Sequence, residues 1–134
     1  MKVEPYLNFN GRCDEAIEFY KKAIGAKVNM LMRFKDAPPG VPSDPKLAEK
    51  VMHASLKVGD GDVNCSDGRC VGATKFEGVM LSLRTDSDDD AKRIFGALAE
   101  GGKITMPMTK TFFASSFGMV DDRFGVSWMV LAGH

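Results

Sequence analysis

The chain has 134 residues, 44% of them hydrophobic, and its 18 Lys and Arg balance its 18 Asp and Glu. This length predicts one domain. The balanced charge, without a basic stripe, argues against a protein that binds nucleic acid or an anionic membrane. No apolar run approaches the roughly 20 residues of a membrane span, and the N-terminus lacks a secretory-signal pattern. Three cysteines argue against a secreted disulfide framework, so we expect a cytoplasmic protein.

The first half of the chain predicts one helix among short strands. Gly11 to Asp14 opens a helix whose apolar residues fall at helical spacing up to Ile24, and Gly25 ends it. Residues 35–46 hold four prolines and predict a loop. Gly59-Asp60-Gly61 predicts a hairpin turn. The predicted strands are residues 5–9, 27–34, 51–58 and 62–66.

The second half repeats this order. Asp86-Ser87 is expected to cap a helix over residues 88–99. An aromatic, Met-rich stretch from Met106 to Leu131 predicts a hairpin, with its turn at Asp121 to Gly125. The predicted strands are residues 79–85, 103–108, 109–119 and 126–131. The chain is therefore an α+β domain of two βαβββ modules, one over about residues 1–70 and one over about 76–134.

His53 is the strongest polar candidate for a site. It alternates with Ala54 along a predicted strand and shares a face with Ser55 and Lys57. A histidine there either acts as a general acid or base or forms a hydrogen bond across the sheet. Both interpretations stay open from sequence alone.

Cysteines and aspartates receive structural interpretations. Cys65 and Cys70 are four residues apart, but no further sulfur or nitrogen ligand follows at a zinc spacing. Cys13 fits packing at a helix start, and Asp121-Asp122 fits turn formation. No phosphate-binding glycine loop or nucleophile elbow is present.

Aromatic side chains of the second half offer a wall for a planar ligand. Phe112, Phe113, Phe117 and Trp128 cannot all point the same way in strands, so some are expected to pack on helices.

Several short motifs, in this order and spacing, resemble the vicinal oxygen chelate superfamily of glyoxalase, bleomycin-resistance and dioxygenase relatives, and its PhnB-like branch in particular. The motifs are Pro5-Tyr6-Leu7, Glu15 to Tyr20, Gly25-Ala26, His53 to Leu56, Ser66-Asp67, Gly101-Gly102, Met106-Pro107, Thr111 to Phe113, Phe117 to Met119 and Asp122 to Trp128. The resemblance implies curved mixed sheets around a cleft, helices on the outer faces, and a homodimer.

The resemblance also implies where a metal would bind. Its ligand positions correspond here to Pro5, Val79 and Met129, with Asn64 or Ser66 as the fourth. None is a strong ligand for a divalent metal, so we expect no metal and no cofactor.

The function that the resemblance implies is therefore binding of a small organic molecule in the cleft. The candidate ligand-binding residues are His53, Ser55, Phe9, Phe112, Phe113 and Met129. The alternative is a metal-dependent lyase or isomerase with a different ligand set that includes His53, so the sequence leaves open whether the chain is an enzyme. PhnB-like proteins often carry a methyltransferase label, but no glycine loop for a methyl donor is evident.

Overall fold

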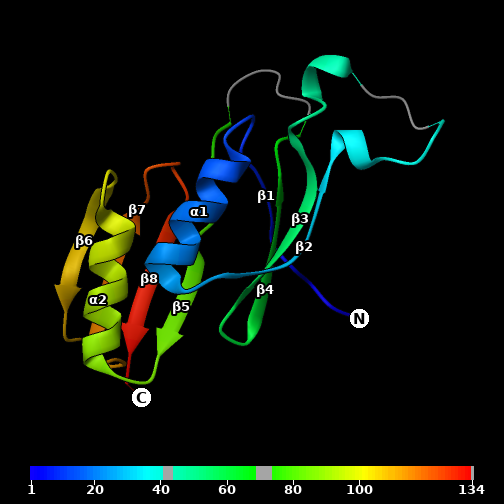
Figure 1. The fold of residues 1–134 in the computed structure, drawn as a ribbon. Helices are drawn as coiled ribbons and strands as arrows, with labels where there is room; N and C mark the ends of the chain where they lie inside the picture. The colour runs from blue at the N-terminus through cyan, green and yellow to red at the C-terminus, as the bar shows by residue number, and fades with distance from the viewer. Residues whose placement is uncertain (41–43, 69–73, 134) are drawn as a thin grey trace. The chain divides into compact units, whose positions relative to one another are not determined.

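A computed structural model describes residues 1–40, 44–68 and 74–133. The chain divides into two compact units, Met1–Thr74 and Lys75–His134. In the described ranges each unit contains one α-helix and one four-stranded sheet, in the order strand, helix, strand, strand, strand (Figure 1). This confirms the predicted repeat of βαβββ modules.

The sheet of the first unit is mixed. Its strand order is β1-β4-β3-β2, with β1 parallel to β4 and the other pairs antiparallel. Its elements are β1 (Tyr6–Asn8), α1 (Cys13–Ile24), β2 (Lys27–Arg33), β3 (Val51–Val58) and β4 (Gly61–Ser66). The proline-rich loop contains two short 3-10 turns, η1 (Phe34–Asp36) and η2 (Pro45–Leu47).

Helix α1 packs on one face of this sheet through its apolar stripe. Ala16, Ile17 and Tyr20 are buried on the helix, and Ala54 and Leu56 are buried on β3. Because side chains alternate along a strand, Ser55, between Ala54 and Leu56, points to the opposite face. The helix ends as predicted, with Gly25 in the left-handed region at a φ of 68°.

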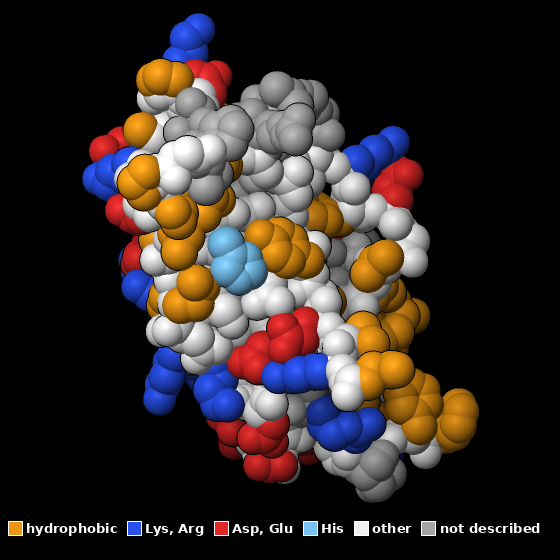
Figure 2. Space-filling view, turned by 90° about the vertical axis from the view of Figure 1, so that its right-hand side faces the viewer, with side chains coloured by type: hydrophobic (Ala, Val, Ile, Leu, Met, Phe, Trp, Pro, Cys, Tyr) orange, Lys and Arg blue, Asp and Glu red, His pale blue; other side chains and the backbone are white. Residues whose placement is uncertain are grey.

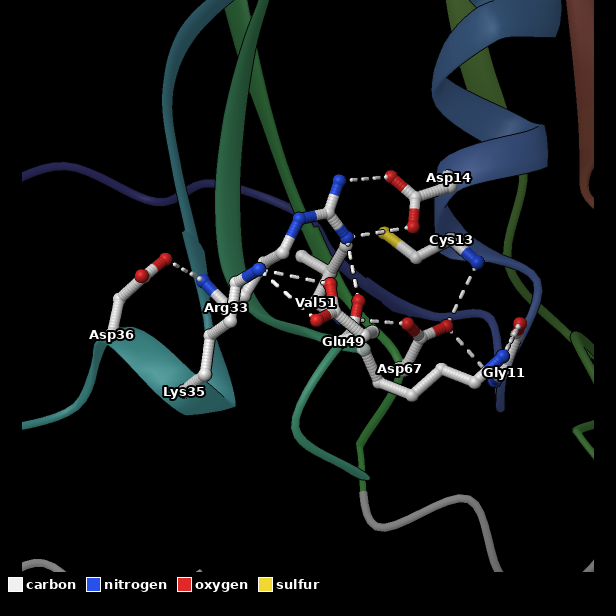
Figure 3. Close-up of polar contacts among 10 residues, drawn as sticks. Gly11, Cys13, Asp14, Arg33, Lys35, Asp36, Glu49, Val51 and Asp67 are labelled. Atoms are coloured by element: carbon white, nitrogen blue, oxygen red, sulfur yellow. Dashed lines mark hydrogen bonds and ion pairs between the residues drawn. The ribbon is translucent and has the colours of Figure 1, made fainter. Parts of the chain in front are cut away.

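The carboxylate of Asp67, fully buried after the end of β4, joins three segments of the first unit (Figure 3). Its Oδ1 accepts hydrogen bonds from the backbone N–H groups of Gly11 and Cys13, each at 2.8 Å. Its Oδ2 accepts one from the N–H of Val51, also at 2.8 Å. No side chain of α1's own N-cap residue, Arg12, caps the helix, so Asp67 satisfies backbone donors that would otherwise be orphaned.

An ion pair links the start of α1 to the end of β2. Both terminal guanidinium nitrogens of Arg33 donate to the carboxylate of Asp14, at 2.8 and 2.9 Å (Figure 3). Arg33 also donates to the backbone oxygen of Glu49. The hydrogen bonds from Arg33 lower the pKa of Asp14 below its ordinary value.

The second unit repeats the topology, with strand order β5-β8-β7-β6 and β5 parallel to β8. Its elements are β5 (Leu81–Thr85), α2 (Asp88–Ala99), β6 (Lys103–Thr109), β7 (Ser116–Asp121) and β8 (Ser127–Ala132). The bounds of α2 match the prediction, and Ser87 caps the helix by accepting from the N–H of Asp90. Phe95 of α2 lies so close to Gly118 of β7 that a Cβ there would sit 2.7 Å from its ring.

Asp122 closes the β7–β8 hairpin as the sequence predicted for this turn. Its side chain is 3% exposed and accepts from the N–H groups of Phe124 and Val126. It also accepts from the indole nitrogen of Trp128 at 3.0 Å. A buried carboxylate thus holds a turn here, as another holds a helix start in the first unit.

The predicted strand over residues 109–119 is wrong in its first half. β7 begins only at Ser116, and the hydroxyl of Thr111 accepts from the N–H of Ala114 at 3.1 Å. The N–H of Thr111 in turn donates to the oxygen of Ala114. This local side-chain hydrogen bond closes a turn around Phe112 and Phe113 and outweighs their strand propensity.

Among the described residues, no helix is both long and apolar enough to cross a membrane.

We predict that Asp67→Ala destabilises the protein by at least about 3 kcal/mol, because three buried backbone donors lose their acceptor. Urea unfolding measures the free-energy difference. The matched control is Asp60→Ala, an exposed residue of the β3–β4 turn, which should stay within about 0.5 kcal/mol of wild type. Equal effects of the two substitutions would contradict the role assigned to Asp67.

We predict that Asp14→Asn destabilises the protein at pH 7 by up to about 1 kcal/mol, as expected for a partly exposed ion pair. The pKa of Asp14 is lowered on folding, so its stabilisation is present above the ordinary Asp pKa of about 3.9 and is lost as pH falls. The difference in the free energy of unfolding between Asp14→Asn and wild type, measured by urea unfolding, should therefore shrink toward pH 3. Glu18→Gln, which removes the exposed pair with Lys21, is the control. A difference for Asp14→Asn that stays constant with pH would contradict this assignment.

Candidate functional site

The face of the first sheet opposite α1 carries a row of side chains from all four strands. Tyr6 of β1 pairs with Asn64 of β4, Asn64 pairs with Ser55 of β3, and Ser55 pairs with Met30 of β2. Residues paired directly across strands share a face. We call this surface, with the neighbouring His53, the polar face of the first sheet.

Tyr6 and His53 form the centre of the polar face. The phenol oxygen of Tyr6 lies 3.0 Å from Nδ1 of His53, and the two rings stack with centroids 5.5 Å apart. Tyr6 is 52% exposed, and His53 is half-buried. Figure 2 shows the imidazole, in pale blue, at the surface beside a hydrophobic side chain. The pair therefore combines an accessible aromatic surface with polar atoms.

Met side chains border this pair on β2. Met30 lies opposite Ser55 and Met32 lies opposite His53 in the strand register. Met30 is 40% exposed and Met32 is half-buried. Flexible, polarisable thioethers adapt to the shape of a bound apolar group.

A network of hydrogen bonds and ion pairs connects polar residues of this face to charged side chains. Asn29 donates through Nδ2 to Ser55 Oγ at 3.3 Å and to Asp62 Oδ1 at 3.2 Å. Lys2 donates to Asp62 Oδ2 at 2.9 Å and pairs with Glu4. The hydrogen bond from Lys2 lowers the pKa of Asp62 and that of Glu4 below their ordinary values. Both carboxylates are thus held ionised as acceptors.

The structure brings together two of the predicted site residues, His53 and Ser55, and separates Phe9 from them. Phe9 is 4% exposed and its ring lies 6.1 Å from that of Tyr20 of α1. It therefore belongs to the hydrophobic core, and we leave it out of the candidate site.

The remaining predicted residues lie in the second unit. Phe112 is 96% exposed in the turn before β7, and its ring stacks edge-on against Phe113, which stacks in the same way against Phe117. Met129 of β8 packs on the small cluster that contains Phe117. Their contact with a ligand stays a prediction.

The residues at the family's metal positions do not fit a divalent metal. Pro5 offers only its backbone oxygen, which accepts from the N–H of Asn64 at 3.0 Å. The side chain of Val79 has no metal-binding atom, and that of Met129 offers a thioether, a ligand for softer metals. Throughout residues 1–40, 44–68 and 74–133, no group of three or more His, Cys, Asp and Glu side chains is placed to hold a metal ion. We therefore derive no chemistry through a metal.

Two of the three cysteines have structural positions. Cys13, at the start of α1, and Cys65, on β4, are free and fully buried. Their thiols form a hydrogen bond, which together with burial raises the pKa of Cys13. This supports the packing role predicted for Cys13. Cys70, which the sequence analysis considered together with Cys65, lies outside the described residues.

Sequence reasoning missed Tyr6, Asn29 and Met30 as parts of this site. Strand alternation separates Tyr6 from Leu7 in the sequence, but it does not reveal that Tyr6 meets His53. Asn29 lies at a β-bulge between Val28 and Met30, so simple alternation misplaces it.

The topology and its structural neighbours define the fold class of the protein. Two βαβββ modules with mixed sheets give this chain the fold of the glyoxylase/bleomycin resistance protein/dioxygenase domain from Frankia sp. EAN1pec, which is 17% identical with a TM-score of 0.64, covering 100% and 92% of the two chains. A family model described as 3-demethylubiquinone-9 3-methyltransferase matches residues 1–131. The chain belongs to that family.

Three relatives illustrate the similarity. Protein YjdN of Escherichia coli (strain K12) is 33% identical over 138 residues, covering 97% of this chain and 94% of that protein. The crystal structure of protein PA1353 from Pseudomonas aeruginosa is 42% identical with a TM-score of 0.86, covering 98% and 97% of the two chains. A putative 3-demethylubiquinone-9 3-methyltransferase, PhnB protein, from Bacillus cereus is 24% identical with a TM-score of 0.81, covering 99% and 100%, and shows the shared fold.

Proposed function

We propose that this PhnB-like protein binds a small, flat organic molecule on the polar face of the first sheet. The observation that carries the proposal is the contact between Tyr6 and His53, a half-exposed aromatic pair joined by a 3.0 Å hydrogen bond. Ligand sites combine apolar and aromatic surface with a few polar groups that set orientation. The polar face offers both.

Each part of this surface has a distinct role in the proposal. The Tyr6 and His53 rings give stacking area to a planar group, and Met30 and Met32 give it an adaptable apolar border. Ser55 supplies a hydroxyl already oriented by Asn29. The methyltransferase activity in the family's description is not carried over to this chain, and homodimer formation and a cytoplasmic location stay predictions.

The proposal excludes a need for metal in binding, which separates it from a metal-dependent lyase or isomerase. The family's metal positions lack suitable donors, and Nδ1 of His53 already contacts Tyr6. A ligand should therefore bind equally well in the presence of a chelator.

We predict that aromatic fragments bind metal-free protein at this face. In NMR spectra of protein with 13C-labelled Met methyl groups, kept in EDTA, the signals assigned to Met30 and Met32 should shift with the fragment that binds best. His53→Ala should lower the affinity for that fragment about tenfold, because an aromatic contact contributes up to about 1.5 kcal/mol.

The matched control is Lys22→Ala, an exposed residue of α1, which should bind like wild type. Phe112→Ala tests whether the aromatic side chains of the second unit contribute. Binding that appears only after a divalent metal is added would contradict the proposal and favour the metal-dependent enzyme.

A further inference from the structure

We infer that the polar face selects ligands whose oriented group accepts hydrogen bonds, as a carbonyl or carboxylate does. The inference rests on the proposed function and specifies its ligand class. It comes from the hydrogen-bond partners already taken by Ser55 and His53, because these leave one donor on each residue available to a ligand.

The hydrogen bonds from Asn29 to Asp62 and to Ser55 leave the hydroxyl of Ser55 as a donor. The carboxylate of Asp62 only accepts hydrogen bonds, so the amide nitrogen of Asn29, not its oxygen, must face it at 3.2 Å. The same nitrogen then donates to Ser55 Oγ at 3.3 Å. Ser55 accepts there, and its proton has no acceptor among the described residues, so it is available to a ligand.

The imidazole of His53 supplies the second donor. Its Nδ1 lies 3.0 Å from the phenol oxygen of Tyr6, and a phenol O–H is a good donor to an imidazole nitrogen. When Nδ1 accepts, the neutral ring carries its proton on Nε2. Within the described part of the chain Nε2 makes no hydrogen bond, so this N–H is also available.

The two donors are placed for a single acceptor group. His53 and Ser55 are two residues apart on β3 and share a face, so their backbones are separated by about 7 Å. Two hydrogen bonds of about 3 Å to one carboxylate or carbonyl group span such a distance. Asn64 donates one amide N–H to Glu4 Oε2 at 2.6 Å, so its second N–H adds a further donor, and its oxygen can accept one donor from the rest of the ligand.

Charges around the face do not by themselves choose between an anionic and a neutral ligand. Lys2 pairs with Glu4 and Asp62, and Lys57 lies opposite Asp62 in the register. Two positive and two negative side chains balance. Hydrogen-bond direction therefore decides the ligand class, and carboxylates and ketones should both bind.

The first test measures the proton position on His53 without any ligand. Long-range 1H–15N NMR of the histidine rings at pH 8.5 should show a protonated Nε2 and an unprotonated Nδ1. Tyr6→Phe keeps the ring and removes the hydroxyl, so the preference for this tautomer should fall. A proton on Nδ1 in the wild-type protein would overturn the inference.

The second test compares three probes with the same aromatic ring: benzoate, acetophenone and benzylammonium. Benzoate and acetophenone accept hydrogen bonds, and benzylammonium only donates. NMR titration should give the two acceptors at least about tenfold higher affinity than benzylammonium, because only they can accept the two hydrogen bonds.

Ser55→Ala should lower the affinity for benzoate and acetophenone three- to tenfold and leave the affinity for benzylammonium unchanged. Lys22→Ala is the control. Tighter binding of benzylammonium would overturn the inference while leaving the binding site in place. A polar face that responds to none of the three probes would instead refute the proposed site, and the inference with it.

Discussion

The buried carboxylate of Asp67 is the constraint on which the first unit depends. It accepts from the backbone of Gly11, Cys13 and Val51, which belong to the start of α1 and the start of β3. A buried charge is tolerated only where hydrogen bonds replace its hydration, and these donors need an acceptor equally. The start of β3 is thereby fixed relative to the helix, so Ala54 points to α1 and His53 to the polar face.

The polar face is built in layers, with charged residues behind neutral ones. Asp62 orients Asn29, and Asn29 donates to Ser55, so the proton of the Ser55 hydroxyl points away from Asn29. The phenol oxygen of Tyr6 lies 3.0 Å from Nδ1 of His53, and in the proposed site it donates to this nitrogen. In the proposed site, such second-layer hydrogen bonds are the means of discriminating between ligands by the direction of hydrogen bonding.

Local signals predicted the elements well wherever nothing distant competed with them. Strand β3 and helix α2 have the predicted bounds, because strict alternation, a serine cap and acidic first-turn residues all indicate one structure. The strand predicted from residue 109 failed because a single hydroxyl, that of Thr111, closes a turn. Its competing hydrogen bond depends on backbone geometry that composition does not reveal.

The sequence by itself determined the repeated modules, the family, and the shared face of His53 and Ser55, because periodicity and motif order are local properties of a chain. Only the tertiary structure decided the partners of these residues. Tyr6 meets His53 across 47 positions and Asn29 meets Asp62 across 33, through a sheet whose strand order is β1-β4-β3-β2. Phe9 is buried against Tyr20 of α1. Alternation gives the side on which a residue points, but the neighbouring strand follows from non-local pairing, which placed Tyr6 at the site.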